Sequence, residues 1–254
     1  MKQPITAIVI TRNEESNIER CLRSLAFCAE IVVVDSGSTD RTRELAKRFT
    51  HKVYDLPWAG FAAQKNNALA HAGHDWILSV DADEVVPPDL AEEITTLFRA
   101  GPPAVAAYSV PRKTIHFGRW IRHGGWYPNR LVRLFSKHQG RWEGEELHEA
   151  WITQGRVASL VHDLEHYSFS DLADQVSRNN RYSSLGAAKL QRKGSSFSSF
   201  WLLIKPTSKF LETYFVKRGF LDGYPGFIIS VSAAYSVFLK WAKLWELEHA
   251  DQKS

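Results

Sequence analysis

Short apolar runs alternate with amphipathic stretches along the first part of the chain. The apolar runs are rich in β-branched residues, which is typical of buried strands, and the stretches between them carry apolar residues at helical spacing. The predicted strands are residues 5–10, 31–34, 52–54 and 76–80, and the predicted helices are residues 15–27, 39–49 and 62–72. Alternating strands and helices favour an α/β, Rossmann-like domain, with a mostly parallel central sheet and helices on both faces, over residues 1–170.

Beyond residue 170 the pattern changes to long helices, predicted at residues 172–190, 206–216 and 226–248. The last of these is strongly apolar, although serines and lysines recur along one side. Its uninterrupted apolar stretch, residues 227–239, is shorter than the roughly 20 residues that cross a bilayer, so we do not expect it to span one. Two interpretations of the helical region 171–254 stay open. It is either an amphipathic element on an anionic lipid surface or a helical element packed against protein.

Polar clusters follow three of the predicted strands. They occupy residues 11–14, 35–40 and 81–83. Ligands of doubly wound sheets bind at the carboxyl ends of the strands, which is where these clusters lie, although such residues also cap helices and form turns. Asp81 and Asp83 suit a hard cation that bridges to phosphates, and the alternative is a solvated acidic turn.

Composition and charge restrict the class of partner. The 254 residues carry a formal net charge of +4, and the sequence pI is about 9.0. This balance fits phosphate-bearing ligands or anionic lipid, and because no nucleic-acid recognition motif accompanies the charge, we predict no nucleic-acid partner. The amino-terminal residues lack the apolar region of a signal peptide, so we expect the catalytic part to be cytoplasmic.

Four motifs, in this order, resemble those of family 2 of the inverting glycosyltransferases, which have the GT-A fold. They are residues 8–14, 32–40, 64–67 and 81–84, and the resemblance covers roughly the first 170 residues. The resemblance implies a nucleoside-diphosphate sugar as donor, Mg²⁺ or Mn²⁺ as cofactor, and inversion at the anomeric carbon.

The same resemblance implies roles for individual residues. Asp83 and His166 would hold the metal, with His162 as a competitor for the histidine role, and Glu84 has no assigned role. Ser36 stands where the family often has a second aspartate that contacts the base, which weakens any inference about the base. The implied donor-binding residues are Thr11, Asn13, Glu14, Asp35, Lys65 and Asp81.

The reaction also needs a group that deprotonates the acceptor hydroxyl. An inverting displacement requires a carboxylate on the face opposite the leaving group. Relatives with a His-Glu pair at about this place use the glutamate, which implies Glu149 as the base, with Glu146 as the second choice. The alternative interpretation of this acidic segment is a charged helix start.

Within the family, the phrases at residues 81–84, 147–149 and 219–223 are most similar to bacterial lipopolysaccharide core glycosyltransferases, which move glucose from UDP-glucose to an inner-core heptose. This implies a lipid-linked saccharide acceptor and a peripheral position on the cytoplasmic face of the inner membrane. The basic aromatic stretch that includes Arg112 and Arg133 is expected on the acceptor side. Two alternatives are a polyprenyl-phosphate glycosyltransferase and an inactive nucleotide-binding module that recruits partners to the membrane.

Overall fold

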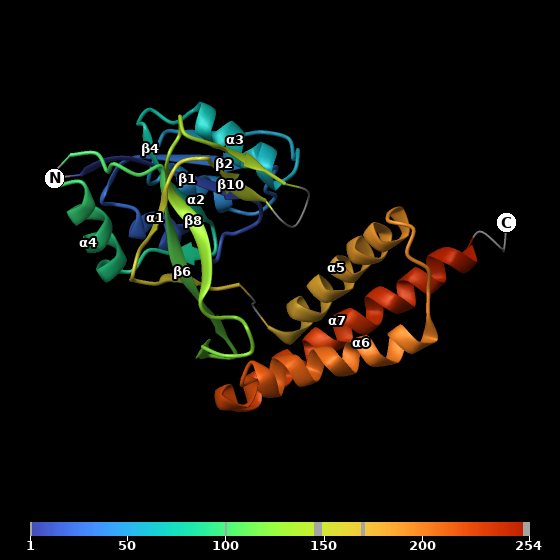
Figure 1. Ribbon diagram of the computed structural model, residues 1–254. Coiled ribbons are helices and arrows are strands. Elements are labelled where there is room, and N and C mark those ends of the chain that lie inside the picture. The colour runs from blue at the N-terminus through green and yellow to red at the C-terminus, as the bar shows by residue number, and fades with distance from the viewer. Residues whose placement is uncertain (1, 100, 145–148, 169–170, 251–254) are drawn as a thin grey trace. The chain divides into compact units, whose positions relative to one another are not determined.

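The computed structural model of the chain describes residues 2–99, 101–144, 149–168 and 171–250 (Figure 1). The chain divides into two compact units. The first comprises Met1–Lys113 and Asn129–His166, and the second comprises Thr114–Pro128 and Tyr167–Ser254. Tyr167, where the second unit resumes, lies close to the boundary expected at residue 170, but residues 114–128 group with the helical unit and not with the first unit.

The first unit is built on a mixed sheet. Its strands are β1 (Gln3–Thr11), β2 (Cys28–Asp35), β3 (Val53–Asp55), β4 (Trp76–Asp81), β5 (Glu84–Val85), β6 (Ala107–His116), β8 (Asn129–Ser136), β11 (Val157–Ser159) and β12 (Leu164–His166), with a separate hairpin of β9 (Arg141–Glu143) and β10 (Ala150–Ile152). The end of β6 extends into the second unit and pairs with β7 (Arg119–Ile121). The strand order is β3-β2-β1-β4-β8-β6-β12-β5, with β11 and β7 paired to β6.

Only part of this sheet is parallel. The expectation of a mostly parallel sheet holds for β3, β2, β1 and β4, and β11 also runs parallel to β6. Strand β8 runs antiparallel to both β4 and β6, and β12 runs antiparallel to β5. Strand β8 runs antiparallel to β6 because the connection between these two strands contains β7 and no helix. Parallel neighbours need a crossover connection, usually a helix, whereas this short link returns the chain antiparallel.

Helices cover both faces of the sheet, as predicted. They are α1 (Ile18–Ser24), α2 (Thr42–Lys47), α3 (Phe61–Ala70) and α4 (Pro88–Leu97). Ile5, Ala7 and Val9 of β1 belong to a core cluster with residues of α1, α2 and α4, while Ile8 belongs to a second cluster with Ala68 of α3 and the β9–β10 hairpin. Alternate residues of a strand face opposite sides, which places one core on each face. Burial of each such Ile or Leu side chain stabilises the folded state by about 1.5–3 kcal/mol relative to leaving it exposed to water.

The second unit contains three long helices joined by short helical turns. These elements are α5 (Leu172–Arg192), α6 (Ser199–Leu211), the π-helical turn η1 (Glu212–Val216), the 3₁₀ turn η2 (Gly219–Asp222) and α7 (Gly223–Ala250). Both α5 and α6 pack along α7 (Figure 1). The prediction that a helix begins at Pro206 was wrong, because α6 begins at Ser199 and holds Pro206 inside. An interior proline removes one backbone hydrogen bond and its ring crowds the preceding turn, but here the apolar run before Pro206 continues the helix through it.

Helix α7 is longer than the sequence argument assumed. Residues 219–249 contain a window that is long and apolar enough to cross a membrane by length and composition, and 22% of that window is buried. The criterion based on uninterrupted apolar residues missed this, because the serines within the helix lower the overall hydropathy only slightly. Length and composition therefore add a spanning helix to the two interpretations of this region, which are a helix on a lipid surface and a helix packed against protein.

Candidate active site

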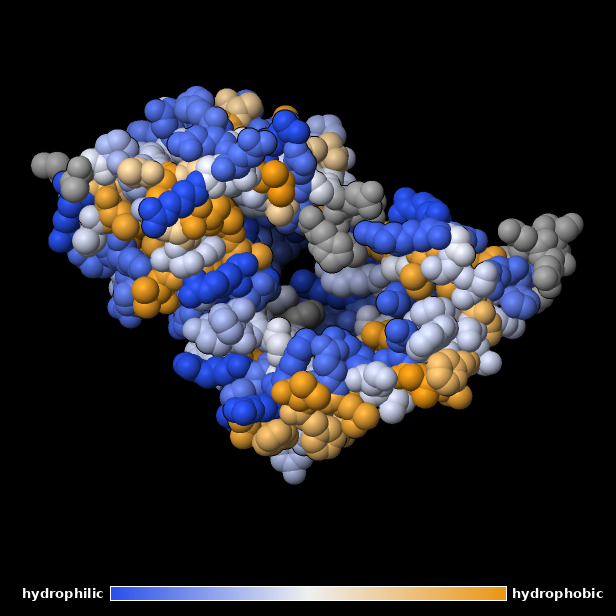
Figure 2. Space-filling model, viewed as in Figure 1, coloured by the Kyte–Doolittle hydropathy of each residue, from blue (hydrophilic) through white to orange (hydrophobic). Residues whose placement is uncertain are grey.

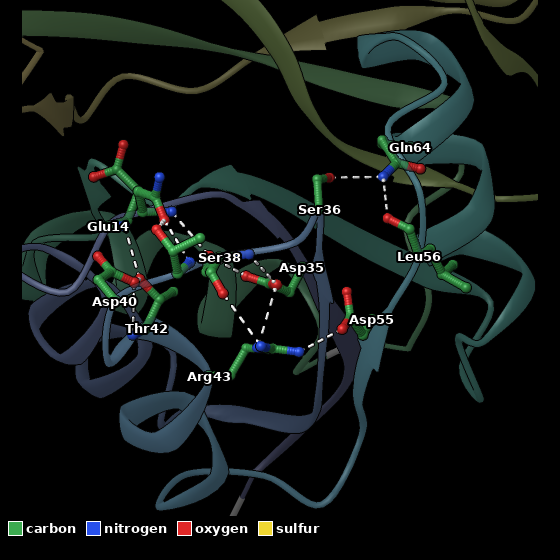
Figure 3. Close-up of polar contacts among 12 residues, drawn as sticks. Glu14, Asp35, Ser36, Ser38, Asp40, Thr42, Arg43, Asp55, Leu56 and Gln64 are labelled. Carbon is green, nitrogen blue, oxygen red and sulfur yellow. Dashed lines mark hydrogen bonds and ion pairs between the residues drawn. The ribbon is translucent and has the colours of Figure 1, made fainter.

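The loops that follow β1 and β2 are joined by hydrogen bonds (Figure 3). Asp35, at the end of β2, accepts from the Ser38 amide at 2.8 Å and from the Ser38 hydroxyl. The same hydroxyl oxygen accepts from the Asn13 amide at 2.8 Å. Asn13 adopts a φ of 55°, a left-handed conformation that Asn tolerates, and its side-chain oxygen accepts from the Thr39 amide at 2.8 Å. The two loops therefore form one preorganised edge of the sheet.

The remaining residues that were expected to bind the nucleotide join this edge. Glu14 donates its amide to the Thr42 hydroxyl at 2.8 Å (Figure 3). Thr11 ends β1 and is buried. Asp35 is fully buried, so contact between its carboxylate and a nucleotide requires the loop to rearrange. Ser36 accepts from the Gln64 side chain at 2.7 Å, which links β2 to α3. The predicted residues thus converge at one edge of the sheet, and their role in donor binding stays a prediction.

Lys65 of α3 contacts two carboxylates, those of Asp81 and Glu149, for which the resemblance implied different roles. Its Nζ lies 3.2 Å from Asp81 Oδ1 at the end of β4 and donates to Glu149 Oε1 at 2.9 Å. The ammonium also lies 4.6 Å from the centroid of the Trp142 ring. The Lys65 side chain is only 3% exposed, so water screens these contacts weakly. The lysine holds Asp81 and Glu149 at one site although they are 68 positions apart in the sequence.

Glu84, to which the resemblance assigned no role, lies at the centre of a buried hydrogen-bond network. Its buried carboxylate accepts from Arg133 at 2.6 Å, from Arg112 at 3.0 Å and from the Asp81 amide at 3.0 Å. Arg133 also donates to Asp81 Oδ2 at 2.5 Å. These two arginines were expected on the acceptor side. The structure shows both bound within this network, and their expected position on the acceptor side stays a prediction.

The network sets the charge of Asp81. Burial by itself would raise the pKa of this carboxyl, but the charges of Arg133 and Lys65 outweigh burial and hold the pKa well below its usual value. Burial would lower the pKa of Arg133, and Asp81 and Glu84 instead raise it. The network therefore favours the ionised form of Asp81.

Asp83 and His166 lie next to each other, as their expected common role requires. His166 Nε2 is 3.3 Å from Asp83 Oδ2, and β5 and β12 pair beside them. His162, the competing histidine, instead contacts Glu93 at 2.9 Å. Among the described residues no group of three or more His, Cys, Asp or Glu side chains could enclose a metal. One carboxylate and one imidazole still fit Mg²⁺ or Mn²⁺, because such ions keep water and take phosphate oxygens as further ligands.

The sequence predicted the site residues at the edge of the sheet but did not predict the buried residues that support them. Glu84 and Arg133 were given no part in the donor site, and the available signal was Arg133 inside the apolar run 131–135 of β8. A charged residue within a buried strand requires a buried partner. Glu146 lies outside the described residues, so the choice between it and Glu149 rests on the contact of Glu149 with Lys65.

A cavity of about 830 Å³ lies elsewhere on this unit. It is lined by α1, by the segment that leads into α4 and by Glu165, and it includes Arg20, Arg23, Val85 and Pro87. Val85 and Glu165 are the strand neighbours of Glu84 and His166. Because side chains alternate along a strand, these neighbours point to the opposite side. None of the predicted donor, metal or catalytic residues lines this cavity, which is therefore separate from the site.

Sequence comparison identifies relatives over nearly the whole chain. The model of glycosyl transferase family 2 matches residues 6–154. The lipopolysaccharide core biosynthesis glycosyltransferase LpsC of Rhizobium meliloti is 31% identical, with 96% of this chain and 93% of LpsC covered. An uncharacterized glycosyltransferase of Rickettsia typhi is 32% identical, with 96% of this chain and 87% of the relative covered. The resemblance found in the four motifs is thereby confirmed.

Solved structures show the same fold. A mannosyltransferase of Pyrobaculum calidifontis, in complex with GDP-mannose and Mn²⁺, gives a TM-score of 0.54 at 17% identity, with 96% of this chain and 88% of that chain covered. Residues 1–349 of TarS from S. aureus, in complex with UDP-GlcNAc, give a TM-score of 0.50 at 15% identity, with 100% and 92% covered. With the family model matching more than half of its residues, the chain belongs to glycosyl transferase family 2 and has the GT-A fold.

Proposed function

We propose that this chain is a metal-dependent, inverting hexosyltransferase that moves a sugar from a nucleoside-diphosphate donor, with UDP-glucose as the first candidate, to a heptose of the lipopolysaccharide inner core. The observation that carries this proposal is the contact of Lys65 with both Asp81 and Glu149, at 3.2 and 2.9 Å. This contact brings the residue expected to bind the donor beside the residue expected to be the base. A transferase needs both at one site.

The proposed reaction uses Glu149 as the general base. Its carboxylate accepts the proton of the acceptor hydroxyl while the acceptor oxygen forms a bond to the anomeric carbon. The bond from that carbon to the diphosphate oxygen breaks, and the electron pair leaves with the nucleoside diphosphate. Attack from the face opposite the leaving group inverts the anomeric configuration. Lys65 positions Glu149 and keeps its carboxylate from rotating away from the acceptor.

Asp83 and His166 are the proposed protein ligands of the divalent ion. Their separation of 3.3 Å and their partial burial suit an ion shared with a diphosphate. When bound, the ion supplies Lewis-acid stabilisation of the negative charge on the departing diphosphate. Asp81, held by Arg133 and Lys65, is proposed to accept a hydrogen bond from the donor ribose.

The proposed acceptor follows from the relatives and from the charge of the chain. LpsC, which shares 31% identity over nearly the full length of both chains, is named for lipopolysaccharide core biosynthesis. A phosphorylated core lipid also suits a chain with a net charge of +4. We therefore place the enzyme at the cytoplasmic face of the inner membrane, as a peripheral protein.

A donor and acceptor screen tests this function. The purified chain is incubated with UDP-, GDP- and ADP-sugars and with core lipid that ends in an unmodified heptose, and nucleotide release and labelled lipid are both measured. We expect transfer from UDP-glucose, loss of transfer after exhaustive chelation, and recovery with Mn²⁺ or Mg²⁺. Full activity after chelation would contradict the metal role.

The acceptor arm separates the alternatives. Transfer to polyprenyl phosphate but not to core lipid would identify the polyprenyl-phosphate enzyme. An absence of transfer to either acceptor, together with saturable binding of UDP, would favour the inactive recruitment module.

A further inference from the structure

We propose that the second unit binds the surface of an anionic phospholipid bilayer and lies flat in its headgroup region, with α6, η1, η2 and the exposed side of α7 as the contact surface. This inference names the membrane contact of the proposed function and rests on that function for its biological purpose. The observations that carry it come from the helical unit alone.

Helix α6 is the first of these observations, because none of its residues is buried. Phe200, Leu203 and Leu211 are large and exposed, and Leu203 has 67% of its surface open to solvent. One side of α6 packs along α7, which gives the helix the apolar contact that most helices in proteins need for stability. The three large side chains named above remain exposed in the part of the chain that the structure describes.

Helix α7 continues the same kind of surface. Its exposed apolar residues, at spacings of three or four that place them on one side of a helix, are Tyr224, Phe227, Val231, Tyr235 and Phe238. Figure 2 shows hydrophobic side chains gathered along the lower edge of the helical unit. Contiguous exposed apolar surface of this kind marks an interaction site, whereas single exposed residues do not.

The turns between the two helices are the most exposed part of this surface. Val216 at the end of η1 has 77% of its surface exposed, and Tyr224 at the start of α7 has 86% exposed. Phe220 in η2 lies between them in the chain and is also exposed. Tyrosine, here Tyr224, is enriched at the level of lipid headgroups, because one end of its ring is apolar and the other is polar.

Positive charge accompanies the apolar residues and favours lipid over protein as the partner. Lys205, Lys217 and Arg218 are exposed along α6 and the turns. Burial chiefly lowers the pKa of Lys240 in α7, and the positive charges of Lys205 and Lys209 in α6 lower it further. Glu212 offsets part of this charge by contacting Lys209 and Lys217. Apolar residues edged by cations complement an anionic bilayer, in which each basic residue adds to the attraction.

The packing of α5 on α7 shows why the unit lies on the bilayer instead of crossing it. Lys243 of α7 donates to Asn180 and Ser183 of α5, and Asn179 of α5 donates to Ser232 of α7 at 2.6 Å. Helix α5 also carries Arg181 and other cations on its exposed side. If α7 crossed the hydrocarbon layer, these charges would enter it as well, at a large cost in free energy.

Flotation of the full-length protein with lipid vesicles tests the proposal. Vesicles of phosphatidylcholine alone are compared with an equal mixture of phosphatidylcholine and phosphatidylglycerol. We expect binding only to the mixture, weakened by added salt and reversed by alkaline carbonate. The double variant Leu203→Glu/Val216→Glu should bind at least tenfold more weakly. The matched control Ile152→Glu/Val157→Glu adds the same charge at exposed positions of the first unit and should bind like the original protein.

Each other outcome overturns the proposal. Unchanged binding of the double variant, or absence of binding by the original protein, shows that this surface does not contact lipid. Resistance to carbonate indicates a spanning helix, and a concentration-dependent dimer that the double variant abolishes indicates a second copy as the partner. Release of nucleotide from the donor sugar, without acceptor, is measured in parallel. This reaction does not require a bilayer. If the original protein released no nucleotide, the result would count against the proposed function and not against the membrane surface.

Discussion

The two units of the chain differ in which side chains they bury and which they expose. The first unit buries charges, with Glu84, Arg133 and Lys65 almost wholly removed from solvent. The second unit exposes large apolar residues, such as Val216 and Tyr224, along α6, its turns and α7. Buried charges are costly unless each has a partner in good geometry, and exposed apolar groups are costly unless something covers them.

The difference indicates what each unit contributes. Charges held in place inside a protein act on a reacting group without having to reorganise, which is an advantage at a catalytic site. Exposed apolar surface gives no such control of geometry but adapts to a fluid partner. We therefore expect substitutions in the first unit to alter catalysis and stability, and those on the exposed surface of the second unit to alter location only.

The largest expected effect is on catalysis. Glu149→Gln should lower the rate of transfer about 10²–10⁴-fold, because the amide cannot accept the proton of the acceptor hydroxyl. The matched control is Glu143→Gln, whose carboxylate is exposed and contacts Arg141. The measurement is single-turnover transfer of labelled sugar. Equal rates for both variants would exclude Glu149 as the base and leave Glu146 to be tested.

The next effect concerns stability of the buried network. Glu84→Gln should lower the free energy of unfolding by about 3–5 kcal/mol, because Arg133 keeps its buried charge while its partner loses one. The control Glu92→Gln removes an exposed partner of Arg99 and should change stability by about 0.5 kcal/mol or less. Urea unfolding followed by tryptophan fluorescence measures both. A loss at Glu84 no larger than at Glu92 would show that the network stabilises nothing.

A smaller effect depends on pH. Glu30 is partly buried, which by itself would raise its pKa, yet hydrogen bonds from Lys52 and Thr6 lower the pKa from 4.5 to about 2. Because the pKa of Glu30 is lower in the folded state than in the unfolded state, its ionised carboxylate stabilises the folded protein at pH values above the unfolded-state pKa. This stabilisation is lost as the pH falls toward the folded-state pKa of about 2. Relative to Glu30→Gln, the original protein should lose about 2–3 kcal/mol between pH 5 and pH 2. The free energy of unfolding of both proteins is measured by urea unfolding at each pH. If it changed equally with pH in the two proteins, this prediction would be wrong.

The smallest effect tests the other side of the comparison. Val216→Glu should change the free energy of unfolding by about 0.5 kcal/mol or less, since the side chain is exposed and contacts little. Thermal unfolding without lipid measures the change. A much larger loss would mean that η1 is covered within the folded protein, and the contrast between the two units would no longer hold.

Much of the first unit followed from its sequence, since the predicted strands and helices all occur with shifts of a few residues at their ends. The antiparallel half of the sheet did not, because pairing direction depends on connections whose path no local pattern records. Asp83 and His166, to which the resemblance gave one common role, lie 3.3 Å apart, and their metal role stays a prediction. The position of Glu84 was missed because its burial depends on arginines from β6 and β8, which reach it only in the folded chain.

The buried network also has a consequence for how this sequence can change over generations. Three positive side chains, Lys65, Arg112 and Arg133, face three negative ones, Asp81, Glu84 and Glu149, so the charges cancel. A single replacement leaves one charge without its opposite inside the protein, which selection removes. A second replacement at the partner restores the balance. Among related sequences, positions 84 and 133 should therefore vary together, and a lineage that lost both would still fold.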